Sequence, residues 1–259
     1  MPAKESDKFV ASNILEGMTS ISALLNAQGH GYNDRKVLSI WIDKTREEKL
    51  SREIRYLRTK AKELHFEIKT VSTEEIAAHV IGNTHGGVIA FCTERTLPEL
   101  KEKDIVQNGF YVYLEGIEDP YNFGYTLRSL FASGVDGVIL SPRNWMSAGG
   151  VVARSSAGAS ELLPLYLAEA ETLIDLFHGA NYRIYAAGIR DSVSIYEAKL
   201  NRPLLLIVGG EKRGISRALL DQADQIVRID YGREFRGSLS AASAATVMAF
   251  EIMRQNRTK

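Results

Sequence analysis

The pattern of apolar and polar residues in the first third of the chain predicts a small α/β domain. Three apolar runs of strand length occupy residues 37–43, 66–72 and 86–92. The stretches between the runs have apolar residues at helical spacing. A further helical face comes before them, formed by Val10, Ile14, Met18, Ile21, Leu24 and Leu25. Strands that alternate with helices favour a mainly parallel sheet.

The second half of the chain repeats this alternation on a larger scale. Five further apolar runs predict parallel strands, at residues 110–115, 137–140, 182–188, 203–209 and 225–229. Several of these runs end in a loop rich in glycine or asparagine. Because ligands of open parallel sheets bind at the carboxyl ends of the strands, these loops are the candidate site.

A charged segment at residues 94–109 separates the two halves and contains one proline and one glycine. Such a composition is typical of a linker. We therefore expect an N-terminal domain at residues 1–93, a linker at 94–109 and a C-terminal domain at 110–259.

The composition is that of an ordinary globular protein, with 45% apolar and 25% charged residues in a chain of 259. The only cysteine, Cys92, lies in an apolar run and is expected in the core. No apolar stretch reaches membrane-spanning length and the first residues lack a signal-like apolar region, which favours a cytoplasmic protein. The histidines and Cys92 show no ligand spacing, so no metal is expected.

The net charge is zero, yet residues 44–63 carry eight Lys or Arg against four Glu. Apolar residues recur in this segment at spacings of three and four, which predicts an amphipathic helix with a basic outer face. One interpretation is a solvated face with ion pairs such as Glu48–Arg52. The other is a surface that faces RNA.

The first of three loops that follow predicted strands has the sequence EDPYNFGYTLRSL, residues 118–130. Pro120 and Asn122 suit a turn and the start of a helix. Gly124 lies four residues before Arg128, so on a helix the arginine leans over a position without a side chain. This leaves room for a bound group beside the guanidinium. An ordinary helix with a surface arginine has the same pattern.

The second loop, IVGGEKRGIS at residues 207–216, is rich in glycine. Gly209, Gly210 and Gly214 let the backbone bend and approach a ligand, and exposed amides there can bind polar groups. A tight turn without a ligand is the alternative interpretation. The spacing is not that of a P-loop, and the first strand of this half does not lead into GxGxxG.

The third stretch is FRGSLSAASAATVMAFE, residues 235–251, in which Leu239 is the only large side chain between Gly237 and Ala245. Ser238 or Ser240 can cap the helix that follows. A helix entrance with so little side-chain bulk allows another group to come close to the backbone. A tightly packed buried helix is the alternative.

Taken together, the three loops resemble the SpoU/TrmH family of RNA ribose 2′-O-methyltransferases, in the SPOUT superfamily. The resemblance rests on the order N-x-G-x-x-x-R, G-x-E-x-x-G and Ser-Leu at a small-residue helix start, over residues 110–256. RSSAGASE at 154–161 is similar to the Ser-x-Gly-Ala segment of the family. EGMTSISALL at 16–25 and NTHGGVIA at 83–90 look like parts of its substrate-binding domain, which is of the ribosomal-protein L30e type.

The resemblance implies a C-terminal α/β domain of the SPOUT type, with a parallel sheet and a trefoil knot. It also implies a small N-terminal α/β domain, L30e-like, that binds the RNA substrate. The family forms homodimers with the active site near the interface. Its cofactor, S-adenosyl-L-methionine, is held in a bent shape among the knot loops. The cofactor-binding positions that match are Gly209, Gly210, Ile229, Leu239 and Ser240.

The reaction implied is methyl transfer to a ribose 2′-hydroxyl. Ribosomal RNA is the favoured substrate, and transfer RNA is the less favoured one. Motif matching points to Arg128, Glu211, Ser238 and Asn122 as the functional set. Arginine stays charged in proteins, so Arg128 is expected to clamp a phosphate and stabilise alkoxide charge. Glu211 orders the loop or Arg128, Ser238 bonds the ribose or a phosphate, and Asn122 shapes the first loop.

Two departures from the family pattern leave alternatives open. Members usually have Ser-Leu-Asn where this chain has Ser238-Leu239-Ser240, and Ile-Pro where it has Ile229-Asp230. The shorter reach of Ser240 supports a non-catalytic RNA-binding or ribosome-assembly protein that kept the fold. Another methyl acceptor or a nucleotide ligand is a further alternative. Methylation of large-subunit ribosomal RNA for antibiotic resistance is a special case of the main hypothesis.

Overall fold

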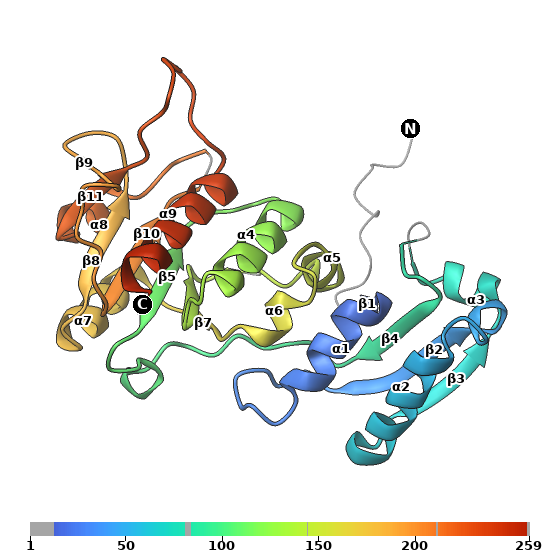
Figure 1. Cartoon of the computed structure of the whole chain (residues 1–259). Helices are drawn as coiled ribbons and strands as arrows, with labels where there is room; N and C mark the ends of the chain where they lie inside the picture. The colour runs from blue at the N-terminus through green and yellow to red at the C-terminus, as the bar shows by residue number, and fades with distance from the viewer. Residues whose placement is uncertain (1–12, 81–83, 144, 211, 258–259) are drawn as a thin grey trace, which may run out of the picture. The chain divides into compact units, whose positions relative to one another are not determined.

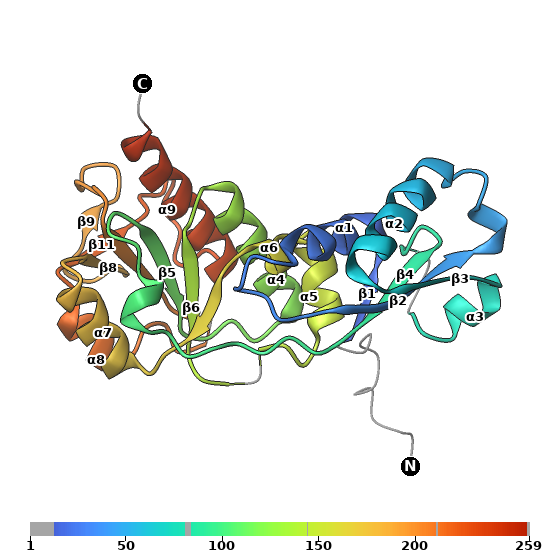
Figure 2. The ribbon, with the colours of Figure 1, turned by 90° about the horizontal axis from the view of Figure 1, so that it is seen from below.

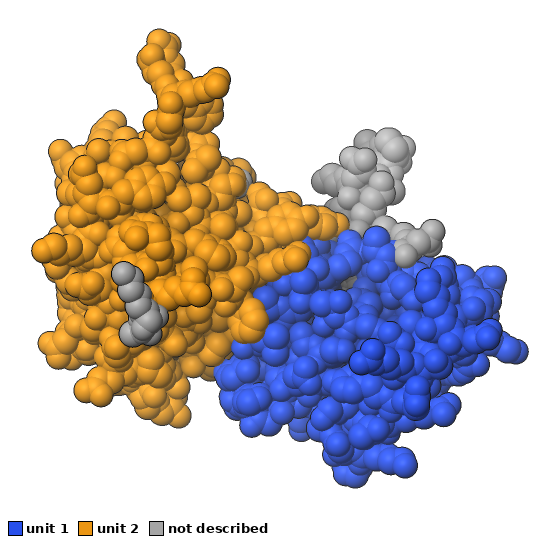
Figure 3. All heavy atoms as spheres, in the orientation of Figure 1, with its two compact units in different colours: residues 1–96, 144–162 blue, residues 97–143, 163–259 orange. Residues whose placement is uncertain are grey.

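The computed structural model describes residues 13–80, 84–143, 145–210 and 212–257. Two compact units make up the chain, and Figure 3 colours them separately. Unit 1 comprises residues 1–96 and 144–162, and unit 2 comprises residues 97–143 and 163–259. This division differs from the predicted one at residues 144–162, which the sequence analysis assigns to the C-terminal domain. Val10 and Glu211 lie outside the described residues.

The sheet of unit 1 has four strands in the order β1-β4-β2-β3 (Figure 1). Their bounds are Ile14–Glu16 for β1, Val37–Asp43 for β2, Glu67–Val71 for β3 and Val88–Cys92 for β4. Only β2 and β3 are parallel, because β4 lies between β1 and β2 and runs antiparallel to both. The expectation of a mainly parallel sheet is therefore wrong for this unit.

Most helices of unit 1 pack on this sheet. The helices are α1 (Gly17–Ala27), α2 (Ser51–Leu64), α3 (Thr73–Ala77), α5 (Gly149–Ser155) and α6 (Ala159–Leu162), with a 3₁₀ turn, η2, at Lys44–Arg46. The exception is α6, which packs on α1 and α5. The basic helix is confirmed but begins at Ser51, because Asp43 caps η2 first. Ile54 and Leu57 are its buried face, whereas Arg52, Arg55 and Arg58 are exposed. Cys92 is buried, and this burial raises the pKa of its thiol to about 12.

A buried polar cluster explains why residues 144–162 belong to unit 1. The Arg35 guanidinium lies 3.3 Å from the Glu161 carboxylate, and both side chains are almost fully excluded from solvent, at 1% and 0% exposure. Asn33 Nδ2 donates to the same carboxylate at 2.9 Å. Arg95 donates to the carbonyl of Ser160. These contacts hold α6 to the N-terminal segment of the chain.

The sheet of unit 2 has seven strands in the order β7-β6-β5-β10-β8-β11-β9, and every pair is parallel. Their bounds are Phe110–Leu114 (β5), Gly137–Leu140 (β6), Leu165–Leu167 (β7), Arg183–Ala187 (β8), Val193–Ser194 (β9), Leu204–Val208 (β10) and Gln225–Arg228 (β11). All five strands predicted for this half are confirmed. The two edge strands, β7 and β9, were not predicted, because three and two residues are too short for a periodic pattern.

Helices cover both faces of this sheet (Figures 1 and 2). They are α4 (Pro120–Ala132) and α9 (Ala241–Asn256) on one face, and α7 (Ala170–Gly179) and α8 (Arg217–Gln222) on the other, while a 3₁₀ turn, η3, spans Glu102–Asp104. Leu205 and Ile207 of β10 share a buried cluster with Phe177 of α7 and Leu219 of α8. In the described part of the chain, no helix is both long and apolar enough to cross a membrane.

Candidate functional site

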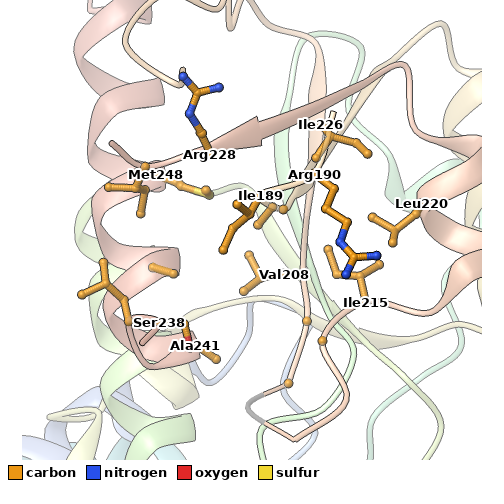
Figure 4. A pocket seen from close by; sticks show the side chains of 18 of the residues that line it. Ile189, Arg190, Val208, Ile215, Leu220, Ile226, Arg228, Ser238, Ala241 and Met248 are labelled. Atoms are coloured by element: carbon orange, nitrogen blue, oxygen red, sulfur yellow. The ribbon is translucent and has the colours of Figure 1, made fainter. Parts of the chain in front are cut away.

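A cavity of about 1080 Å³ opens at the carboxyl ends of β8, β10 and β11 in unit 2 (Figure 4). The last residues of these strands, Ala187, Val208 and Arg228, all line it, together with the loops that follow each strand. The N-terminal part of α9 forms another wall. This is the position at which open parallel sheets bind ligands, so the expectation drawn from the strand pattern is met by an actual cavity.

Backbone contacts define the glycine loop at the cavity. The amide of Gly210 donates to the carbonyl of Gly214 at 3.2 Å, and the amide of Gly214 donates back to Gly210 at 2.9 Å. A Cβ atom on Gly209 would overlap the backbone of Gly214, and one on Gly210 would overlap the carbonyl of Gly116. Two neighbouring chain segments therefore exclude any side chain at Gly209 and Gly210, both of which line the cavity.

Replacing Gly210 with alanine is expected to lower the free energy of unfolding by about 1–3 kcal/mol, because the new methyl group collides with backbone that cannot move aside cheaply. The matched control is Gly232→Ala. A methyl group on Gly232 would meet no atom within 4 Å, and the residue has no positive φ, so its change should stay within about 0.5 kcal/mol. Urea unfolding of both variants measures the difference, and equal values would contradict this account of the loop.

The entrance of α9 brings small residues to the cavity, as the sequence predicts. Ala241 and Ala244 line it, with the larger Met248 one turn further along α9, and Ser238 lies beside Ala241 at its edge (Figure 4). Of the two candidate caps, Ser240 is the one used, since its hydroxyl accepts from the amide of Ser243 at 3.2 Å. Ser240 itself does not line the cavity. Its hydroxyl thus stabilises the helix start directly behind the cavity wall.

The cavity wall is rich in arginine from separate loops, a feature that no local sequence pattern predicts. The charged lining residues are Arg190, Arg213, Arg217, Arg228, Arg236, Asp191, Asp221 and Asp230. Arg217 pairs with Asp221 at 2.9 Å, and Arg228 pairs with Asp230 at 2.8 Å. A hydrogen bond with the Ser194 hydroxyl lowers the pKa of the Asp230 carboxyl most, and Arg228 lowers it further. Among the described residues, the other three arginines make no ion pair, so this lining favours a ligand that carries anionic groups such as carboxylate or phosphate.

Asn122 and Arg128 lie on α4 and do not line the cavity. The helix starts at Asp119, whose carboxylate accepts from the Asn122 amide at 2.8 Å, so Asn122 occupies the first turn rather than a loop. Arg128 is exposed and has no ion pair among the described residues. Of the predicted site residues, the cavity therefore gathers Gly209, Gly210, Ile229, Ser238 and Leu239.

No group of three or more histidine, cysteine, aspartate or glutamate side chains within residues 13–80, 84–143, 145–210 and 212–257 could hold a metal ion. The cavity instead offers backbone amides, arginines and small apolar side chains. Such a lining suits an organic ligand that carries polar and charged groups.

Comparison with known proteins indicates the family to which the chain that carries this site is similar. The model of the SpoU rRNA Methylase family matches residues 109–250, which is more than half of the chain and includes every strand-end loop of the cavity. Among curated proteins, the 23S rRNA (guanosine-2′-O-)-methyltransferase RlmB of Shewanella oneidensis is 28% identical over 255 residues, covering 95% of this chain and 98% of that protein. RlmB of Haemophilus influenzae is 27% identical over 252 residues, covering 94% and 98%.

Solved structures share the fold over nearly the whole chain. The AdoMet-bound rRNA methyltransferase from Sinorhizobium meliloti superposes with a TM-score of 0.75 at 22% identity, covering 95% of this chain and 88% of that one. The SpoU methyltransferase AviRb from Streptomyces viridochromogenes, in complex with AdoMet, has a TM-score of 0.74 at 22% identity, covering 93% and 89%. From the family match and the parallel sheet with its strand-end cavity, we conclude that the chain belongs to the SpoU rRNA methylase family.

Proposed function

We propose that this protein is an enzyme that transfers a methyl group from S-adenosyl-L-methionine to a ribose 2′-hydroxyl in RNA, with ribosomal RNA as the substrate. The observation that carries the proposal is the strand-end cavity, which unites the glycine loop and the Ser238-Leu239 segment within the family match. The curated relatives that span this chain from end to end are named as 23S rRNA methyltransferases, which supports ribosomal RNA over transfer RNA.

The residues at the cavity fit this cofactor. Gly209 and Gly210 present backbone without side chains, and Ile229 and Leu239 add apolar surface. When bound, the cofactor supplies an electrophilic methyl group on its sulfonium. Small-molecule sites usually measure about 300–1,000 Å³, so a cavity of about 1080 Å³ has room for the cofactor and part of a nucleotide.

The chain's own residues must orient the hydroxyl, stabilise charge on its oxygen and exclude water. Ser238 lies at the cavity edge, where its hydroxyl can bond the ribose or a phosphate. The Arg128 guanidinium serves as a phosphate clamp and a donor to the developing alkoxide. Glu211 is proposed to order the glycine loop or Arg128. Asn122 is proposed to shape the segment that leads into α4.

We further propose a homodimer built across α4 and α9. These helices pack on each other and expose four large aromatic side chains, Tyr121, Tyr125, Phe131 and Phe250. Of the apolar residues on α9, Ile252 is fully buried in its own chain, whereas Phe250 is 39% exposed. Because Arg128 lies on α4 outside the cavity of its own chain, a dimer across this face would let it serve the cavity of the partner.

The proposal also includes a knot in the C-terminal domain, RNA binding by the N-terminal domain and a cytoplasmic location. The family match over residues 109–250 supports a knotted C-terminal domain, as the resemblance implies. The exposed arginines of α2 support an L30e-like, RNA-binding role for the N-terminal domain. A protein that modifies ribosomal RNA would act in the cytoplasm, where we place it.

The test uses methyl-labelled S-adenosylmethionine with unmodified ribosomal RNA and transfer RNA, supplied separately. The proposal predicts label in ribosomal RNA and little in transfer RNA. Label in transfer RNA alone would overturn the choice of substrate. RNA binding without any transfer would instead favour the non-catalytic RNA-binding alternative.

A further inference from the structure

The loop between β11 and α9 carries exposed aromatic and basic side chains next to the cavity. It extends away from the sheet of unit 2 (Figure 1), and all residues from 231 to 240 are exposed. Phe235 is 60% exposed and Tyr231 is 38% exposed, although both line the cavity mouth. Large apolar rings that stay in water at the mouth of a site are typical of surfaces that bind a partner.

The local geometry fixes the position of these rings. The centroids of Tyr231 and Phe235 lie 5.9 Å apart at an interplanar angle of 55°. The amide of Leu239 donates to the Tyr231 hydroxyl at 3.2 Å, which ties the two ends of the loop together. A Cβ on Gly237 would lie 2.5 Å from the Phe235 ring. Glycine at this position therefore lets the ring fold back to the residue directly before Ser238.

The charges beside the rings suit a phosphate backbone. Arg236 directly follows Phe235, and Arg233 precedes it by two residues with Glu234 between them; both arginines are exposed and make no ion pair among the described residues. Arg236 also lines the cavity. Aromatic rings interleaved with arginines are the combination with which proteins bind single-stranded nucleic acid, because bases stack on the rings and phosphates pair with the cations.

We propose that Phe235 stacks on a base of single-stranded RNA adjacent to the ribose presented at Ser238, with Arg233 and Arg236 binding the flanking phosphates. The identity of the ligand rests on the proposed function. Two observations favour RNA over the cofactor as the partner of Phe235. The ring is mostly exposed to solvent and the two nearby arginines suit repeated phosphates, whereas Gly209 and Gly210, which line the cavity, are partly buried.

The test compares Phe235→Ala, Phe235→Trp and a control, Tyr196→Ala. Tyr196 is an exposed aromatic residue of unit 2, at 53%, that does not line the cavity. Binding of a fluorescein-labelled single-stranded oligoribonucleotide is followed by anisotropy, and binding of S-adenosylhomocysteine by calorimetry. Phe235→Ala should weaken RNA binding roughly tenfold, with unchanged affinity for S-adenosylhomocysteine. Phe235→Trp should keep the RNA affinity of the wild type. The fluorescence added by the new tryptophan should be quenched by RNA, and the fluorescence of wild-type protein, which has Trp41 and Trp145, is subtracted as background.

Unchanged RNA affinity in Phe235→Ala would overturn the proposal, and so would a loss of S-adenosylhomocysteine affinity, which would assign the ring to the cofactor. The result for the stacking role of Phe235 can be distinguished from the result for the proposed methyl transfer. If no RNA is methylated but Phe235→Ala still weakens RNA binding, the stacking role stands and the methylation falls. If methylation occurs and Phe235→Ala binds RNA like the wild type, the stacking role falls alone.

Discussion

Arg128→Ala is expected to lower the rate of methyl transfer by about 10²–10³-fold, with unchanged affinity for S-adenosylmethionine. The loss has the size seen when one donor to a developing oxyanion is removed. The cofactor affinity should hold because Arg128 does not line the cavity of its own chain. Arg128→Lys is the matched variant: it keeps the charge but loses the bidentate fork, so its activity should fall between those of alanine and arginine.

Single-turnover rates with saturating cofactor measure this effect, and calorimetry measures the cofactor affinity. Activity of Arg128→Ala within about threefold of the wild type would contradict the role given to the guanidinium. A parallel loss of cofactor affinity would place Arg128 at the cofactor rather than at the RNA.

Mixed dimers show which protomer supplies Arg128. Co-expression of Arg128→Ala and Ser238→Ala chains with different tags yields dimers that carry one defect on each chain. If Arg128 serves the cavity of the partner, one of the two sites is intact, and about half of the wild-type activity should return. Activity no higher than that of the parent variants would assign Arg128 to the cavity of its own chain.

Glu161→Ala is expected to lower the free energy of unfolding by about 3–5 kcal/mol, because it removes the buried carboxylate that pairs with the Arg35 guanidinium. Asn33 also loses its carboxylate acceptor. Glu63→Ala is the matched control. Its carboxylate pairs with Lys60 at 2.7 Å, but both side chains are partly in solvent, so its loss should cost less than about 1 kcal/mol.

Urea unfolding of the two variants gives the comparison directly. A cost for Glu161→Ala no larger than that for Glu63→Ala would mean that the buried cluster does not hold α6 to unit 1. The same measurement bears on the division of the chain, since α6 joins unit 1 through this cluster.

The sequence predicts most of the fold because long apolar runs leave few alternatives. All five strands proposed for the second half exist, and Val37–Asp43 matches its predicted run residue for residue. The direction of β4 was not predictable, since an apolar run does not encode parallel or antiparallel pairing. The grouping of residues 144–162 with unit 1 depends on contacts between residues about 126 positions apart, such as Arg35 with Glu161.

The candidate site is predicted in part, for a similar reason. Gly209, Gly210 and Ser238 stand out because they lack bulk or follow a strand, and all three line the cavity. The arginines of the lining come from separate loops, and nothing in the local sequence around Arg190 or Arg236 links one to the other. Asn122 lies in the first turn of α4 because Asp119 caps the helix three residues earlier.

Nucleoside analysis shows whether the methyl group is transferred to a ribose hydroxyl. Unmodified large-subunit ribosomal RNA is incubated with the protein and methyl-labelled S-adenosylmethionine, digested to nucleosides, and resolved by mass spectrometry. We expect one labelled 2′-O-methylribonucleoside with the wild-type protein and none with the Arg128→Ala variant. Label on a base, or no label in RNA that the protein binds, would contradict the proposed transfer.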